Sequence, residues 1–368
     1  MLKRLHLKNF TVFADANFEF VQGLNVIVGT NGTGKSHVLK LGYVIESARY
    51  EIRKQFESEK LADAVTNSIA WASTLFKGLP EVFLTSQLAP FIRWNSNEQA
   101  RVVVDFGGSE LEQLIFNLTP ISIESGNDST SLGIDSATGI EEALKPVFIP
   151  AKEILTLNWI SPASEQIVIP VERNYLDLLA QLRLLPLRKP EAIDAIQSLT
   201  NIIGGEVREE EGRYYLVDKT GRRTTISMVA EGLRKFGTLQ KLLANGSLTK
   251  ATTLYWDEPE ANLNPALLRK LAAILAEIAR QGFQIILATH SMSLLKEFHI
   301  LSRDKDKAKL PIRYFGLNAE PGQPTTVVTK DDFEYLPDVV ALQVELEQAD
   351  ALEEVFIQDD QKANADRR

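Results

Sequence analysis

One eight-residue stretch constrains this chain more than any other: GTNGTGKS, from Gly29 to Ser36. It matches the phosphate-binding loop pattern G-x-x-x-x-G-K-[ST] at every fixed position. The glycines let the backbone curl around an anion with its N–H groups pointing inward, and a following helix would add the positive end of its dipole. The stretch therefore predicts a nucleoside triphosphate site.

The flanking residues have the order that such a loop needs. The apolar run 24–28 predicts a buried strand before the loop, and the proline-free residues 35–58 predict a helix after it. In that arrangement Lys35 reaches the outer phosphates of ATP, and the hydroxyl of Ser36 is offered to Mg2+. The candidate nucleotide contacts are Gly29, Asn31, Gly32, Thr33, Gly34, Lys35, Ser36 and His37. The side chain of His37 is expected on the helix surface.

Composition limits the class of protein. The 368 residues are 44% hydrophobic and 24% charged and include no cysteine, which excludes disulfides and thiolate metal sites. No apolar run approaches the ~20 residues of a membrane helix, and the start of the chain does not read as a signal peptide. We therefore expect a cytoplasmic protein with no membrane partner. The net charge is −9, of which residues 345–368 carry −5, so charge leaves DNA open as a partner.

A second motif supplies carboxylates. Residues 252–258 form an apolar run that ends in Asp257 and Glu258, as in a buried strand that ends at a phosphate-binding loop. Asp257 would hold Mg2+, directly or through water, and Glu258 would act as general base on the attacking water. We expect this strand to lie directly beside the strand at 24–28.

A third motif follows a turn and a helix. Residues 266–280 predict the helix, residues 283–289 predict another apolar strand, and His290 comes at the end of that strand. In open α/β sheets, ligands bind at the carboxyl ends of the strands. Of the four histidines in the chain, His290 is therefore the one that we expect at the γ-phosphate or the attacking water.

Together these motifs resemble the ABC-type ATPase heads of the RecF, SMC and OLD superfamily. The resemblance rests on three segments, GTNGTGKS (29–36), YWDEPEANLNP (255–265) and ATHS (288–291). It implies an ATPase that uses ATP and Mg2+, with residues 261–265 as the D-loop and His290 as the switch histidine. The residues that would act in catalysis are Lys35, Glu258 and His290, and those that would bind the metal are Ser36 and Asp257.

The resemblance also implies a signature motif that opens a helix before the second motif. Its counterpart is SMVAEGLRK, residues 227–235, in which Glu231 and Gly232 match the core of the motif. Ala230 stands where a serine commonly contacts the γ-phosphate. Three nearby residues could take over that contact: Ser227, Arg234 and Lys235. In the family, the signature of one protomer closes on the ATP of another, which implies a homodimer or a higher even-numbered oligomer held by ATP.

The predicted fold is α/β, a two-lobed ABC-ATPase head with a mixed P-loop sheet and no long coiled coil. The ATPase core takes residues 1–157 and 205–330, a helical lobe is inserted at 158–204, and residues 331–368 form an acidic tail whose last part is disordered. Prolines and loops, without heptads, fill the 190 residues between the phosphate-binding loop and the signature. The long arms of SMC proteins therefore cannot be built from this chain.

Among compact heads, the motifs look most like the ATPase part of OLD-like anti-phage systems such as PtuA. OLD nucleases carry a metal-binding Toprim domain, whereas this chain offers only Asp304 and Asp306 as a similar pair of carboxylates. We therefore expect an ATPase without a nuclease site of its own, which controls a separately encoded effector nuclease in anti-phage defence. The alternatives are a RecF-like clamp in DNA repair and, less favoured, the ATP-binding subunit of a transporter.

Overall fold

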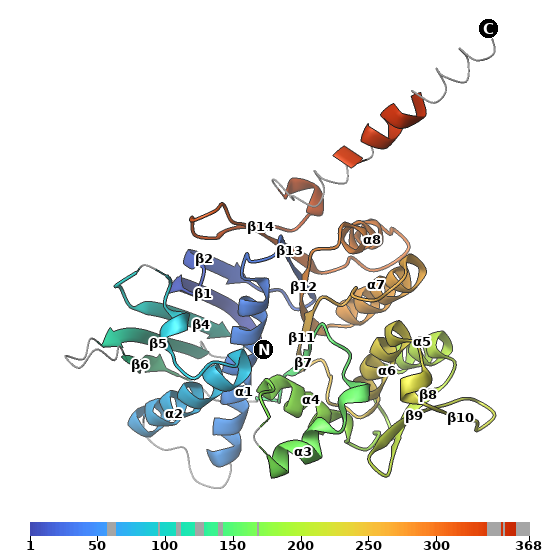
Figure 1. The fold of residues 1–368 in the computed structure, drawn as a ribbon, viewed down its shortest axis with the longest axis horizontal. Coiled ribbons are helices and arrows are strands. Elements are labelled where there is room, and N and C mark those ends of the chain that lie inside the picture. Colours follow the sequence, from blue (N-terminus) through green and yellow to red (C-terminus); the bar gives the residue numbers. More distant parts are fainter. Residues whose placement is uncertain are drawn as a thin grey trace.

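The computed structural model describes residues 1–56, 64–94, 96–107, 112–121, 129–138, 143–167, 169–336, 347–348 and 350–357. A central sheet stands between an antiparallel sheet on one side and a helical region on the other (Figure 1). This mixed α/β, two-lobed arrangement confirms the predicted fold class. The longest helix in the described part has 22 residues, and no long coiled coil is present there.

The central sheet carries the three sequence motifs. Its strands are β3 (Leu24–Gly29), β7 (Val147–Ile149), β11 (Thr253–Asp257), β12 (Gln284–Thr289), β13 (Ile312–Asn318) and β14 (Thr326–Lys330). They lie in the order β14-β13-β3-β12-β11-β7, and all neighbours pair in parallel except β14, which is antiparallel to β13. Strand β12 and nearly all of β11 are buried, as expected for apolar strands that are covered by helices.

The strand before the phosphate-binding loop does not lie beside the strand that ends in Asp257, so that expectation is wrong. Strand β12 lies between them and pairs with both. Parallel strands need a crossover, and helix α7 (Pro265–Arg280) provides it by leading from β11 back to the start of β12, which fills the position next to β3. All three strands still end at one edge of the sheet, so the motifs meet there.

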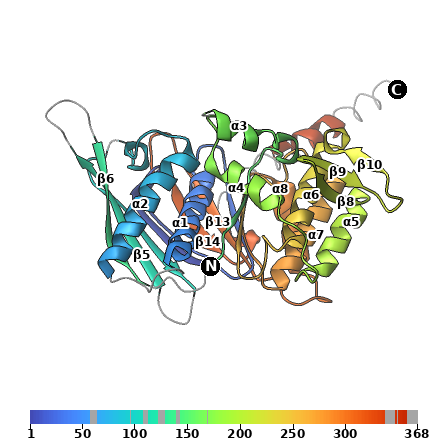
Figure 2. The same cartoon turned by 90° about the horizontal axis from the view of Figure 1, so that it is seen from below.

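The second sheet is antiparallel and has the order β2-β1-β4-β5-β6. Its strands are β1 (Leu2–Phe10), β2 (Phe13–Glu19), β4 (Ala100–Phe106), β5 (Glu112–Ile121) and β6 (Ser129–Ala137). Helices α1 (Lys35–Phe56) and α2 (Ala64–Phe83) lie against it (Figure 2). Helix α1 shares one hydrophobic cluster with both sheets, which includes Phe116 of β5 and Phe315 of β13. The predicted end of this helix, at residue 58, lies outside the described residues.

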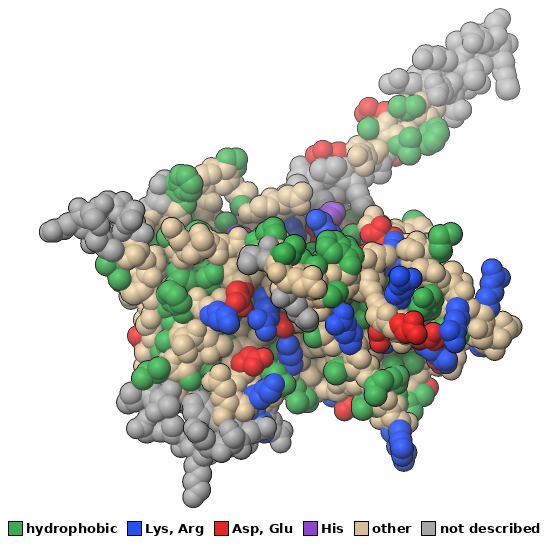
Figure 3. Space-filling model, turned by 60° about the horizontal axis from the view of Figure 1, so that its bottom comes forward, with side chains coloured by type: hydrophobic (Ala, Val, Ile, Leu, Met, Phe, Trp, Pro, Cys, Tyr) green, Lys and Arg blue, Asp and Glu red, His purple; other side chains and the backbone are tan. Residues whose placement is uncertain are grey.

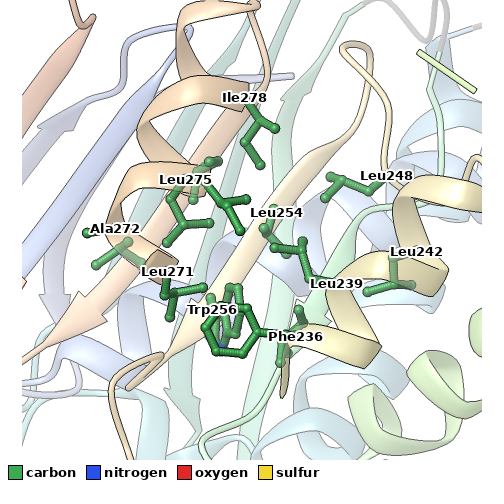
Figure 4. Packing of buried hydrophobic residues seen from close by; sticks show 14 of the residues in the cluster. Phe236, Leu239, Leu242, Leu248, Leu254, Trp256, Leu271, Ala272, Leu275 and Ile278 are labelled. Atoms are coloured by element: carbon green, nitrogen blue, oxygen red, sulfur yellow. The ribbon is translucent and has the colours of Figure 1, made fainter. Parts of the chain in front are cut away.

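The helical region covers the other side of the central sheet. Its elements are α3 (Ile160–Gln166), α4 (Arg173–Leu182), α5 (Ile193–Ile203), the strands β8 (Glu206–Glu210), β9 (Arg213–Val217) and β10 (Arg223–Thr225), and α6 (Glu231–Ala244). Helix α8 (Met292–Ser302) follows β12, and short 3₁₀ turns occur at Ala89–Phe91, Leu155–Leu157, Ile226–Met228 and Phe333–Tyr335. Helices α6 and α7 enclose β11, where Phe236 and Leu271 approach Trp256 from opposite sides (Figure 4).

Two remaining predictions concern the limits of the lobes and the tail. Helices α3, α4 and α5 fall within the predicted range 158–204, and the division of the chain into core and lobe stays a prediction. The disordered last part of the tail lies outside the described residues. Within the described residues, no helix is both long and apolar enough to cross a membrane.

Helix α1 comes so close to β11 that only glycine fits between them. A Cβ at Gly42 would lie 2.8 Å from Cε1 and 2.9 Å from the hydroxyl of Tyr255, a fully buried ring that donates a 2.7 Å hydrogen bond to Glu46. Gly42→Ala should therefore overpack this contact and lower the free energy of unfolding by about 1–3 kcal/mol, as measured by urea denaturation.

Gly78 in α2 provides a matched control. The atom nearest to a Cβ added there is Val44 Cγ1, at 3.4 Å, which is close to ordinary contact. Gly78→Ala should be neutral or stabilising by up to about 1 kcal/mol, because alanine favours a helix over glycine. Equal stability of the two variants would contradict the tight packing of α1 on β11.

Candidate functional site

The phosphate-binding loop is the turn between β3 and α1, and its shape depends on three glycines. Gly32 and Gly34 have φ values of 84° and 90°, which residues with a Cβ rarely adopt. A Cβ at Gly34 would also lie 2.6 Å from Val12 Cγ2, and one at Gly29 would lie 2.6 Å from the carbonyl oxygen of Leu317. The loop therefore fits closely between its neighbours, and larger residues at these positions would deform it.

The other loop residues divide between the inside and the outside of the turn. Asn31 and Gly32 are exposed at its tip, where a ligand could reach their N–H groups, whereas Thr33 is buried and its hydroxyl donates a 2.8 Å hydrogen bond to Thr30 O. The first N–H groups of α1 have no carbonyl partner within the helix. The turn and the helix start thus present N–H donors to one place, as an anion site requires.

The side chain of Lys35 folds back over the loop. Its Nζ donates 2.8 Å hydrogen bonds to the carbonyl oxygens of Gly29 and Thr30. Burial lowers the pKa of Lys35, and the nearby carboxylates of Glu258 and Asp257 oppose that shift. The ammonium group is held at the loop by carbonyl groups alone, which phosphate oxygens could replace as stronger, charged acceptors.

A carboxylate and a hydroxyl meet beside the loop. The hydroxyl of Ser36 donates a 2.8 Å hydrogen bond to Asp257 Oδ2. Burial raises the pKa of Asp257, the hydrogen bond from Ser36 opposes that rise, and the neighbouring Glu258 adds to it. Mg2+ is bound in proteins through one or two carboxylates together with hydroxyl, water and phosphate oxygens. The donor set of this pair fits Mg2+, with Ser36 and Asp257 as the residues that would hold it.

Glu258 and His290 lie close together at the same edge of the sheet. Glu258 Oε1 lies 3.2 Å from His290 Nδ1, and the Glu258 N–H donates a 2.9 Å hydrogen bond to Ala288 O of β12. Glu258 has a φ of 45°, a strained value for a residue with a side chain. The imidazole is half exposed, so both groups could contact a water molecule beside a bound phosphate.

Glu260 belongs to this cluster, although the sequence analysis did not identify it. Its side chain is buried, and Oε1 accepts a 2.5 Å hydrogen bond from the Thr289 hydroxyl and a 3.4 Å bond from His290 N. The same oxygen lies 4.0 Å from His290 Nδ1. Glu260 therefore fixes the end of β12 from which His290 projects. The signal was present as a second acidic residue two positions after Glu258.

The start of α6, with Glu231 and Gly232, contacts the D-loop of its own chain. Asn262 Nδ2 donates a 2.8 Å hydrogen bond to Glu231 Oε1. A Cβ at Gly232 would lie 3.0 Å from Asn262 O and 3.0 Å from Leu263 Cδ2. Glycine is therefore needed here for packing within the chain, and the proximity to a nucleotide that the motif implies stays a prediction.

Two of the three candidates for the missing serine contact are engaged within the chain. Arg234 lies 3.3 Å from a carboxylate oxygen of Glu153, and Lys235 Nζ donates a 3.2 Å hydrogen bond to Glu258 O. Burial lowers the pKa of Lys235. Ser227, in contrast, is exposed. Of the three, Ser227 is the one whose side chain is open to a second molecule.

Two further residues near the loop, His37 and Tyr175, differ from what the sequence predicted. The ring of His37 is half-buried against Phe83 of α2, with 5.9 Å between ring centroids, and not on the free helix surface. A nucleotide contact from His37 stays a prediction. Tyr175 of α4 has its pKa raised to about 12 by burial and by the charges of Glu172 and Asp257. The helical region thus extends to the edge of the sheet that carries Asp257, which no local sequence pattern predicted.

The raised pKa of Asp257 leads to a prediction on stability. When folding raises the pKa of a carboxyl, the stability linked to its titration is fully present below the pKa of the unfolded state, about 3.9 for aspartate. That stability is lost as the pH rises through the pKa of the folded state. At pH 7 the buried charge therefore destabilises the nucleotide-free protein. Asp257→Asn should raise the melting temperature at pH 7 by about 1–2 °C, as for ~1 kcal/mol in a chain of 368 residues.

This effect is measured by thermal denaturation in EDTA at a series of pH values. The advantage of Asp257→Asn should shrink as the pH falls toward the unfolded pKa, because the wild-type carboxyl then becomes neutral. If Asp257→Asn melted at a lower temperature than the wild type at pH 7, the hydrogen bond from Ser36 and the charges of the nearby lysines would stabilise the carboxylate by more than its burial costs.

Two segments of the chain match protein-family models. Residues 142–296 match a family described as "AAA domain, putative AbiEii toxin, Type IV TA system", and residues 4–41 match an AAA domain. The first segment includes the signature, Asp257, Glu258 and His290, and the second includes the phosphate-binding loop. Comparison with curated proteins found no match.

Among solved structures, the chain is similar to SMC head domains. An SMC head bound to the C-winged helix domain of ScpA gives a TM-score of 0.50 at 16% identity, over 90% of this chain and 98% of that one. The head domain from Thermotoga maritima gives 0.48 at 16% identity, over 89% and 98%. A head with an extended coiled coil, bound to the C-terminal domain of ScpA derived from Pyrococcus furiosus, gives 0.49 at 15% identity, over 96% and 99%.

At these identities the structural similarity concerns the fold alone. The family matches add AAA-type ATPase segments at the places where the nucleotide motifs lie. The chain thus has an SMC-head-like ATPase fold with AAA-family segments, which indicates an ATP-binding ATPase.

Proposed function

We propose that this chain hydrolyses ATP with Mg2+ in sites completed by a second copy, and that nucleotide state controls a separate effector. One observation carries the proposal. The Ser36–Asp257 pair, at 2.8 Å, and the Glu258–His290 pair, at 3.2 Å, lie at the same edge of one sheet. An oxygen donor set for a metal and a base for water are therefore side by side.

Each residue has a role that its position supports. The N–H groups of residues 29–36 and Lys35 would hold the phosphates, and Ser36 and Asp257 would hold Mg2+, which supplies charge neutralisation on the phosphate oxygens. Glu258 would accept a proton from the attacking water. His290 would orient that water or the γ-phosphate, with Glu260 fixing its backbone.

The first test separates binding from chemistry. Glu258→Gln should leave binding of Mg2+ and ATP intact and lower the hydrolysis rate by about 10^2–10^4-fold, the usual contribution of a general base. Lys35→Ala should abolish ATP binding. Binding is measured by calorimetry and hydrolysis by phosphate release. If both variants bound ATP equally poorly, the division of roles would be wrong.

The start of α6 supports the part of the proposal that concerns a second copy. No side chain caps this helix, and its N-cap residue Ala230 is exposed, as are Ser227 and Met228. Met228 is 80% exposed, so its side chain is free to contact a second copy. An uncapped helix start offers N–H groups to an anion. We infer that it closes on the γ-phosphate of a second copy, giving a dimer or a higher even-numbered assembly.

A mixing experiment tests shared sites. Lys35→Ala disables the loop of one protomer, and Met228→Asp places a negative charge at the exposed signature of the other without touching the D-loop. Gly232 is unsuitable, because a side chain there disturbs the same chain. A 1:1 mixture of the two inactive proteins should regain about a quarter of wild-type activity, since half of the dimers are mixed and each has one complete site. A mixture as inactive as its components would contradict shared sites.

The effector is the part of the proposal that rests on the motifs and on a family description. The motifs look most like OLD- and PtuA-type heads, and the family that matches residues 142–296 is described by a putative toxin of a type IV toxin–antitoxin system. The motifs favour a role in defence against phage, and the family description favours a system of two components. ATP closure would expose or cover the surface that a separately encoded nuclease recognises.

Partner capture and phage plating test this role. Wild-type protein should capture a product of a neighbouring gene, and the pair should reduce phage plating while Lys35→Ala with the same partner should not. Capture of a membrane protein would favour the transporter subunit. No partner and no protection, together with ATP-dependent loading of recombination proteins on gapped DNA, would favour the RecF-like clamp.

A further inference from the structure

A cavity of about 330 Å³ lies in the helical region, away from the nucleotide motifs. It is formed where the end of α4 and the start of α5 meet α6 and β8; α5, α6 and β8 stand together in Figure 1. Its wall is mainly apolar, with side chains of Leu184, Leu185, Pro186, Ile196, Val207 and Ala244. The volume is within the range of small-molecule sites, which are apolar with a few polar groups.

Lys241 of α6 is the polar group that makes this cavity unusual. It lines the cavity and is only 8% exposed, yet within the described residues its Nζ has no hydrogen bond and no ion pair. Its Nζ lies 5.7 Å from the centroid of the Tyr214 ring. Burial lowers the pKa of Lys241 against the opposing charge of Glu209. The charge of Glu209 offsets the cost of burying this ammonium only in part, and the anionic group of a ligand would offset more of it.

Two other donors near Lys241 are also unused. The Tyr214 hydroxyl is buried and has no hydrogen-bond partner in the described part of the chain. Arg183, which lines the cavity at its open side, counteracts the rise in the pKa of Tyr214, so its charge lies nearby. Arg183 itself forms no ion pair with the described residues. Lys241 and Arg183, which both line the cavity, can donate to one anion there.

The remaining polar groups of the wall are already paired. Gln240 bonds to Val207 N and to Gly205 O, at 3.0 Å each. The acidic side chains are engaged in three contacts: Glu206 with Arg208, Glu210 with Arg223, and Glu209 with Gly212 N. Among the cations of the wall, Lys241 and Arg183 therefore remain without an ion pair to the described residues.

We propose that this cavity binds a small organic anion, with its carboxylate or phosphate at Lys241 and an apolar body against Leu184, Pro186 and Ile196. The charge of the ligand would compensate the buried ammonium, and its apolar part would cover side chains that now face the cavity. Leu184 and Leu185 are 52% and 84% exposed, so the apolar surface at the mouth is available to a ligand.

The position of Lys241 connects this ligand to the nucleotide site. Lys241 lies ten residues after Glu231 on the same helix, a distance of about 15 Å. A ligand that bridges α4, α5 and α6 would fix the orientation of α6 and of the signature at its start. This regulatory part rests on the proposed function, whereas binding does not.

Three fluorinated probes test binding by 19F NMR on the full chain. They are 4-fluorobenzoate, 4-fluorophenyl phosphate and, as the uncharged control, 4-fluorobenzyl alcohol. At least one of the two anions should broaden in the presence of the wild-type protein, and the better of the two identifies carboxylate or phosphate as the preferred group. The alcohol should bind at least 10-fold more weakly.

Variants assign the binding to the cavity. Lys241→Met keeps the length of the side chain and should weaken anion binding at least 10-fold without lowering the melting temperature, because it removes a buried charge. Lys241→Arg should retain most of the binding, and Lys219→Met, at an exposed lysine in the turn before β10, should bind as the wild type. Equal binding by wild type and Lys241→Met, equal binding of the alcohol, or no binding of any probe would overturn the proposal.

The effect of the ligand on the ATPase rate is measured separately from its binding. The bound anion should change the ATPase rate of the wild type at least twofold and leave Lys241→Met unaffected. A bound probe with an unchanged rate would overturn the regulatory part alone. A protein that binds the probe but hydrolyses no ATP would instead count against the proposed function.

Discussion

One hydrogen bond, from the Ser36 hydroxyl to the Asp257 carboxylate, joins residues that are 221 positions apart. It depends on the placement of α1 against the central sheet and of β11 within it. Ser36 stands in the first turn of α1, and Asp257 ends β11. They meet because parallel strands end at one edge of the sheet and because α1 packs along that sheet after the loop has reversed the chain. The same contact opposes the rise that burial causes in the pKa of Asp257, beside the loop where phosphates and a metal would bind.

The sequence predicted what depends on neighbouring residues. The glycine loop, the apolar strands and the helices after them are local patterns, and so were the three motifs that the sheet edge brings together. The strand order was wrong because the adjacency of β3 and β11 is decided by where α7 returns the chain, not by either strand. Glu260 was overlooked because its importance comes from Thr289, on another strand.

The sequence also could not predict which groups the side chains of α6 contact. Arg234 and Lys235 look alike in sequence as free cations after the signature, but one faces Glu153 and the other faces Glu258 O. Lys241, two turns further along α6, looks like an ordinary helical lysine. Only the packing of α4, α5 and β8 around it shows a largely buried cation with no hydrogen bond or ion pair from Nζ to the described residues.

The contacts at the start of α6 suggest how two nucleotide sites in the proposed dimer would be coupled. Asn262 and Lys235 connect the signature to the residues that follow β11 in the same chain. In a dimer, that signature would contact the ATP of the partner, while Glu258 would act on the ATP of its own chain. Occupancy of one site would then displace the catalytic carboxylate of the other. Two sites coupled in this way would not act independently, and the dependence of the hydrolysis rate on ATP concentration would depart from a simple hyperbola.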